Sequence, residues 1–247
     1  MTTTVKSAKR ILNKNIRLAK KYGFNDAIKK VFTMVAIVLL ILSGPIKSPN
    51  NSYANEITSK NAIHLKQDIQ FTNDEIQDLL LKSKVVDWKR ANKIILKGES
   101  FKVIEPTTGT VIDMKRTGGS NHMDVETLTF TDTEKMKYLW DGFSWERKGF
   151  ILVTRTRDTY IVSMHGMPHA GLDEQIGGKT ISARSCGFGT GVNYDYVKDN
   201  GMDGHVCIHF KNSRTHCKNA VDYKHQNEII KLQELKNKIF NDMLEEF

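Results

Sequence analysis

Residues 204–210 read GHVCIHF, which places two histidines and one cysteine within five positions. On a helix, His205 and His209 would share a face, as metal ligands four residues apart do, and Cys207 would point away from them. On a strand, all three residues share one face. The apolar residues between them alternate with a period of two. This alternation predicts a strand at 205–210, with a thiol between two imidazoles on its polar face.

Histidines gather in the second half of the chain. Five of the eight fall within 52 residues, namely His165, His169, His205, His209 and His216. His165 ends a predicted strand just before the turn Gly166–Met167–Pro168, and strand ends that run into loops often carry reactive groups. An imidazole can accept the proton of a neighbouring thiol, which would make Cys207 a nucleophile. Attack on an amide carbonyl would give a thioester, which an amine resolves in a transpeptidase and water resolves in a hydrolase.

These segments resemble the active-site signature of the YkuD-type L,D-transpeptidases. In that family a histidine in a His-Gly strand end precedes a Ser/Thr-His-Gly-Cys segment. His165-Gly166 is similar to the first element, and His205-x-Cys207 is similar to the second. The resemblance implies that Cys207 is the nucleophile, that His165 is its general base and that His205 supports the cysteine segment. It also implies the family's mixed β-sheets and peptidoglycan stem peptides as substrate.

Other residues are expected to bind substrate or to support the site. His169 follows Pro168 closely enough to replace His165 as the base if His165 points away. The remaining supporting residues are Gly166, His209, His122 and Asp124.

A metal site is the second hypothesis that the sequence leaves open. His122-x-Asp124 could bind zinc together with His165 and His169, as in a zinc-dependent peptidoglycan peptidase or amidase. The HExxH motif of many zinc peptidases is absent. More simply, Asp124 could orient His122 as a structural pair. A catalytically inactive module that binds the wall is a third possibility, and the cysteine enzyme without a cofactor remains the leading prediction.

The chain has three cysteines, Cys186, Cys207 and Cys217. In an exported protein an odd number suggests one bridge and one free thiol. A bridge between Cys186 and Cys217 would leave Cys207 free, whereas three free thiols would suit a bacterial wall protein equally well.

The surrounding pattern predicts an α+β protein with a mainly β catalytic domain at 99–225. Residues 55–98 are expected to form a helical N-terminal segment, and 226–247 a C-terminal amphipathic helix. Strands are expected at 101–105, 110–116, 150–156, 159–165 and 205–210, and helices at 74–96 (in one or two pieces), 131–140 and 226–245. The glycine-rich stretch 171–204 is the longest expected loop.

The composition assigns the positive charge to the beginning of the chain. The formal charge is +9, but residues 1–54 hold ten lysines and arginines and one acid, and the remainder is neutral. This excludes a nucleic-acid footprint on the remaining chain. The basic start precedes an uncharged segment at 31–42, which suits a signal peptide better than a full membrane span. We therefore expect an exported bacterial wall protein, whose residues 1–54 are cleaved or serve as its only membrane anchor.

Overall fold

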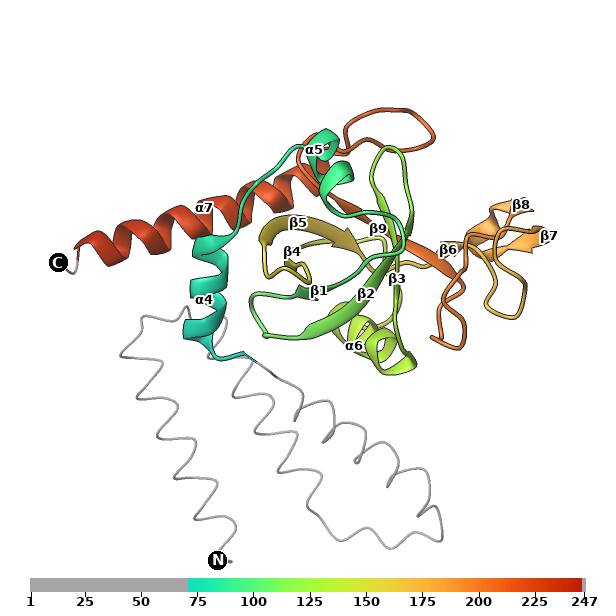
Figure 1. Cartoon of the computed structure of the whole chain (residues 1–247), viewed down its shortest axis with the longest axis horizontal. Helices are drawn as coiled ribbons and strands as arrows, with labels where there is room; N and C mark the ends of the chain where they lie inside the picture. The colour runs from blue at the N-terminus through green and yellow to red at the C-terminus, as the bar shows by residue number, and fades with distance from the viewer. Residues whose placement is uncertain (1–70, 246–247) are drawn as a thin grey trace, which may run out of the picture. The chain divides into compact units, whose positions relative to one another are not determined.

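The computed structural model of the protein describes residues 71–245, and the predicted leader at 1–54 lies outside them. Within the described part, nine strands and four α-helices form the α+β fold that the sequence predicts (Figure 1). The pairings between these strands are all antiparallel, so the mixed sheets that the family resemblance implies are not confirmed. No helix between residues 71 and 245 is long and apolar enough to cross a membrane.

Six strands close on themselves through antiparallel pairing. The strands are β1 (Ser100–Ile104), β2 (Val111–Gly118), β3 (Met123–Thr127), β4 (Arg147–Val153), β5 (Thr159–His165) and β9 (Gly204–His209). Their order is β3-β2-β1-β4-β5-β9, and β3 also pairs with β9. This last pairing joins the two edges of the sheet, so the six strands form a small barrel. A closed barrel leaves no unpaired edge among these strands.

The alternation of side chains separates an apolar inside from a mixed outside. Val162 and Met164 of β5 and Val206 and Ile208 of β9 point inward and are fully buried, as the sequence predicts. The residues between them in sequence therefore point outward. On β9 these outward residues are the two histidines and the cysteine of the GHVCIH segment.

Two helices add to the same apolar cluster. α5 (Trp88–Ile94) is capped by Asp87, whose side chain accepts the Lys89 N–H. The helix contributes Trp88 to the cluster. α6 (Phe130–Trp140) contributes Trp140, which stacks on Phe150 of β4 with ring centroids 5.6 Å apart. In Figure 1 the two helices lie on opposite sides of the strands.

A second apolar cluster lies outside the barrel, where α4 (Asn73–Lys82) and α7 (Tyr223–Glu245) cover β4 and β5. Thr72 and Glu75 form a capping box at the start of α4, because each side chain accepts a backbone N–H from the other residue. Leu80 of α4 and Ile229 of α7 are buried in this cluster.

The expected elements agree with the structure at most places and differ at several boundaries. The strand at 159–165 is confirmed with those bounds, whereas the strand expected at 150–156 lies at Arg147–Val153. The helical stretch expected at 74–96 in one or two pieces is two helices, separated by residues 83–87, and the C-terminal helix begins at Tyr223 instead of 226. β3 was not expected at all.

The stretch 171–204 is not purely a loop. It contains the short hairpin of β7 (Thr180–Arg184) and β8 (Gly189–Val192), joined by the 3₁₀ turn η1 (Ser185–Gly187). Just before it, β6 (His169–Ala170) pairs with the beginning of β9.

Candidate functional site

The register of β9 with three neighbouring strands places Cys207 at the centre of a polar group. Asp124 of β3 is its direct partner across one edge of β9. On the other edge, Ser163 of β5 pairs with His209 and His169 of β6 pairs with His205. Directly opposite residues share a face, so these side chains all lie outside the barrel around the thiol.

The approach of β6 to β9 depends on Gly204. This residue has φ +101°, and a Cβ atom there would lie 2.1 Å from the backbone oxygen of His169. A side chain at position 204 would therefore push β6 away, and only glycine tolerates both the angle and the contact.

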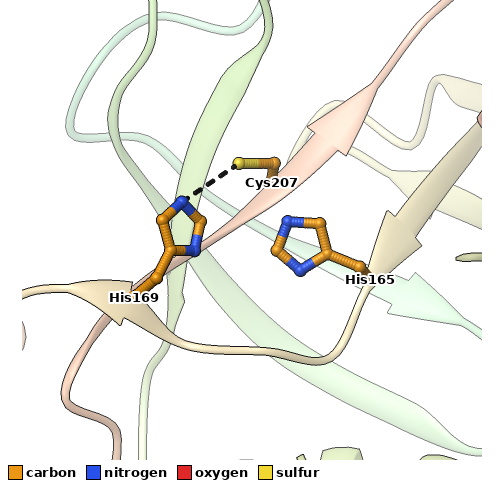
Figure 2. A group of neighbouring side chains, drawn as sticks. All are labelled: His165, His169 and Cys207. Carbon is orange, nitrogen blue, oxygen red and sulfur yellow. Dashed lines mark hydrogen bonds between the residues drawn. The ribbon is translucent and has the colours of Figure 1, made fainter. Parts of the chain in front are cut away.

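Cys207 contacts His169 and not the residue that the family resemblance favours. The Cys207 Sγ atom lies 3.9 Å from His169 Nε2, as the dashed line in Figure 2 marks. His169 Nδ1 lies 3.1 Å from the carbonyl oxygen of Met167. A carbonyl only accepts, so Nδ1 carries the proton and Nε2 presents a lone pair to the thiol.

His165 is also close to the Cys207 thiol and to His169. Ligand atoms of His165, His169 and Cys207 all lie within 4.8 Å of one another, a spacing that one water can bridge. His165 Nδ1 accepts the Met167 N–H at 3.3 Å, so the neutral ring carries its proton on Nε2. Figure 2 shows a nitrogen of this ring turned toward Cys207. The assignment of His165 as the base stays a prediction.

Both members of the Cys207–His169 contact are neutral near pH 7. Burial raises the pKa of the Cys207 thiol well above its ordinary value, and the Asp124 carboxylate raises it further. Burial also lowers the pKa of His169 to about 4. The thiolate–imidazolium pair is therefore not formed in the resting protein.

Asp124 is the centre of a second group of histidines. Its Oδ1 atom lies 3.2 Å from His122 Nε2, 3.4 Å from His216 Nε2 and 3.7 Å from His205 Nε2. Burial alone would raise the pKa of Asp124, but its interactions with His122 and His216 outweigh burial and lower it. The hydrogen bond to Asp124 in turn raises the pKa of His216.

A stack of three rings continues this group toward α7. His209 lies between His122, at a centroid distance of 4.6 Å, and His225, at 3.8 Å. His225 Nδ1 is 2.9 Å from the hydroxyl oxygen of Ser163 on β5. The sequence did not indicate His225, because it stands alone near the start of a helix.

The predicted site residues thus come together, but they do not line an open cleft. Cys207 is only 5% exposed, and His122, His165, His169, His205 and His209 are also buried. The Trp145 ring lies 4.8 Å from that of His165 and 5.1 Å from that of His169. Trp145 itself is 41% exposed, so it lies between these histidines and the solvent. Neighbouring side chains therefore cover the Cys207 thiol.

Gly166, the expected supporting residue, packs against α6. A Cβ atom at this position would lie 2.7 Å from the Trp140 ring, and its backbone exchanges two hydrogen bonds with Ser144. Its position keeps the segment that leads to Trp145 close to the end of β5.

All three cysteines of the chain are free thiols in the structure. Cys186 and Cys217 are exposed, and the Cys186 Sγ atom contacts the carbonyl oxygen of Pro168 at 3.2 Å. The structure therefore agrees with the alternative of three free thiols and does not contain the bridge.

No protein-family model, curated protein or solved structure matches this chain. The resemblance to the YkuD-type enzymes accordingly depends on the two short motifs alone and stays a prediction.

Proposed function

We propose that this protein is an exported bacterial wall enzyme that transfers acyl groups through Cys207, similar in chemistry to an L,D-transpeptidase. The observation that carries the proposal is the contact between Cys207 Sγ and His169 Nε2. Its oriented lone pair makes His169 the general base, in place of His165.

The proposed reaction begins with the neutral pair. As Cys207 sulfur attacks an amide carbonyl of a stem peptide, the thiol proton moves to His169 Nε2. The C–N bond then breaks, the leaving amine takes that proton, and a thioester remains. A second amine, or water, resolves the thioester with His169 again as the base. The Nε2–H of His165 is suited to donate to the developing thiolate.

Peptidoglycan is the proposed substrate because of the amino-terminal sequence. The basic start and the uncharged segment at 31–42 support export to the wall, where stem peptides supply both the amide and the amine. Substrate would have to displace Trp145 to reach the sulfur, since that ring covers the two histidines.

The test is mass spectrometry of peptidoglycan fragments incubated with the full chain after chelation of metal ions. Cys207→Ala should abolish new cross-links or cleavage, and His169→Ala should lower the rate by about 10²–10⁴-fold. Cys217→Ala is the matched control, because it removes an exposed thiol and should keep full activity. Activity that survives Cys207→Ala would contradict the proposal.

A further inference from the structure

The side of Cys207 that faces β3 carries a different set of donors from the side that faces His169. Ligand atoms of His122, Asp124 and Cys207 all lie within 4.8 Å of one another. His216 Nε2 is not part of this group, but it lies 3.4 Å from Asp124 Oδ1 and is the exposed donor next to it. Nitrogen, oxygen and sulfur donors thus converge on one space outside the seam between β3 and β9.

The protons on His122 indicate what this space holds. His122 Nδ1 lies 2.7 Å from the carbonyl oxygen of Arg214, so that nitrogen carries the proton. The neutral ring then has a bare Nε2, which is buried and has no hydrogen-bond partner within the described residues. This nitrogen lies 3.2 Å from Asp124 Oδ1, without the alignment of a hydrogen bond. A buried nitrogen that lacks a partner and lies beside a carboxylate and a thiol is in the position of an unused metal ligand.

We propose that His122, Asp124, Cys207 and His216 bind one divalent transition-metal ion, for which zinc is the best fit. Bonds of about 2.0–2.3 Å to a tetrahedral zinc ion place its ligand atoms roughly 3.3–3.8 Å apart. The Asp124 distances to His122 and His216 lie at about this spacing. The mixed set of imidazole, carboxylate and thiolate donors suits zinc and not magnesium or calcium.

The hydrogen bond from His122 to Arg214 has the form expected next to a metal. A ligand histidine usually donates its other N–H to a carbonyl or carboxylate, which fixes the ring and its tautomer. His216 is the exposed member of the set, so the ion can enter from its side.

This ligand set differs from the one expected from the sequence. His122 and Asp124 remain, but His165 and His169 lie in a separate group around the same sulfur. His165 carries its proton on Nε2, which leaves no lone pair there for a metal.

Metal binding and acyl transfer exclude each other in this arrangement. Binding exchanges the thiol proton for the ion, which forms a sulfur–metal bond and releases one proton to solvent. A sulfur bound to the metal no longer has a proton for His169 to accept. The metal-bound form is therefore inactive in acyl transfer, whereas the metal site itself does not depend on the proposed function.

The experiment titrates the metal-free full chain with Zn²⁺, followed by calorimetry, and with Co²⁺, followed by absorbance. We expect one ion per chain and the near-ultraviolet absorption of a cobalt–thiolate bond. Cys207→Ala should lose that absorption. His122→Ala and Asp124→Asn should weaken binding by more than the roughly 10–100-fold that outer-shell partners contribute.

His169→Ala is the matched control, because it removes an imidazole from the opposite side of the same sulfur. It should change the affinity by only a few-fold. Thermal unfolding of each metal-free variant identifies those that fail to fold, and His122→Gln replaces His122→Ala if the latter does. Absence of a one-to-one complex, or equal affinity in the wild type and a folded His122 variant, would overturn the site.

Activity of the same samples separates the two proposals. Loss of acyl transfer on adding Zn²⁺, with recovery after chelation, supports both. If activity requires the ion, the proposed metal site is supported and the proposed cysteine mechanism is wrong. If the protein is active but binds no metal ion, the proposed cysteine mechanism is supported and the proposed metal site is wrong.

Discussion

The proton on each imidazole decides what that ring can do beside Cys207. The Nδ1–H groups of His122 and His169 each donate to a backbone carbonyl. The Nε2 atom of each ring is therefore the one without a proton. His165 has the opposite tautomer, because its Nδ1 accepts an N–H. Near the Cys207 sulfur, His169 can therefore accept a proton and His165 can donate one. His122 is the ring that we propose as a metal ligand.

Proton release should accompany metal binding. The pKa of Cys207 is raised by burial, so the thiol is protonated below and around pH 7, whereas the ligand is the thiolate. Each ion should therefore displace about one proton, and affinity should rise about tenfold per pH unit between pH 6 and 8. His216, whose pKa is raised, adds a smaller release toward pH 6.

Calorimetry in buffers of different ionisation enthalpy measures this proton number. Cys207→Ser, whose hydroxyl does not ionise in this range, is the control and should release clearly fewer protons. An affinity for Zn²⁺ that is constant across these pH values would contradict the thiolate ligand.

Trp145 should control access to the thiol. In a Cys186→Ala/Cys217→Ala background, Cys207 is the only cysteine, and alkylation with iodoacetamide reports on it alone. Trp145→Ala should raise the alkylation rate by about tenfold. This corresponds to a free-energy cost of exposing the sulfur that is lower by about 1.4 kcal/mol.

Phe143→Ala is the control for this substitution, since Phe143 is similarly exposed and its ring lies over the Lys137 ammonium. It should leave the alkylation rate unchanged. Equal rates in wild type and Trp145→Ala would show that another segment limits access.

At the scale of elements, the close approach of β6 to β9 positions His169 against the thiol. Gly204→Ala would force a Cβ atom against the backbone oxygen of His169. We expect a loss of about 1–3 kcal/mol in the free energy of unfolding, from the positive φ and the clash together. Denaturation by urea measures this loss.

Gly98→Ala separates the two causes. Gly98 also has a positive φ, +93°, but nothing lies within 4 Å of its Cβ position. It should therefore show only the conformational cost. A similar loss of stability in both variants would mean that the contact between β6 and β9 contributes little.

The sequence predicted the strands that carry the thiol better than the strand that completes the site. β5 and β9 alternate clearly over six or seven residues, and their apolar faces were identified correctly. β3 has only five residues, and two of them are the outward-facing acids Asp124 and Glu126, so its alternation resembled a polar loop. Its pairing with β9 is a long-range contact that no local pattern reveals.

At the scale of the whole molecule, the most deeply buried contacts of α7 with the barrel come from its first half, whereas Ile239 in its second half is only partly buried against the same cluster. The apolar spacing predicted one continuous stripe, yet Leu232 is buried while Leu235 is 43% exposed. Leu232 lies against Gly149 of β4, where a Cβ atom would be 2.7 Å from its Cδ1. The stripe was correctly located, but it is not buried evenly along the helix.

Two leucine substitutions should report this difference. Leu232→Ala should lower the free energy of unfolding by about 2–4 kcal/mol, because it empties a packed position. Leu235→Ala should change it by less than about 0.5 kcal/mol, as at an ordinary surface position. Urea denaturation of both variants is the measurement, and equal losses would indicate that something else covers Leu235 in solution.

The pairing of β3 with β9 also has a consequence for the timing of folding. It joins segments that are distant along the chain, as the contact of His122 with Arg214 across 92 residues illustrates. Contacts of such separation are costly to form early, because the intervening chain loses entropy before other contacts compensate. Asp124 and Cys207 therefore become neighbours only as the barrel closes. A chain that crosses a membrane unfolded would carry its thiol and histidines apart, and would acquire its chemistry only at its destination.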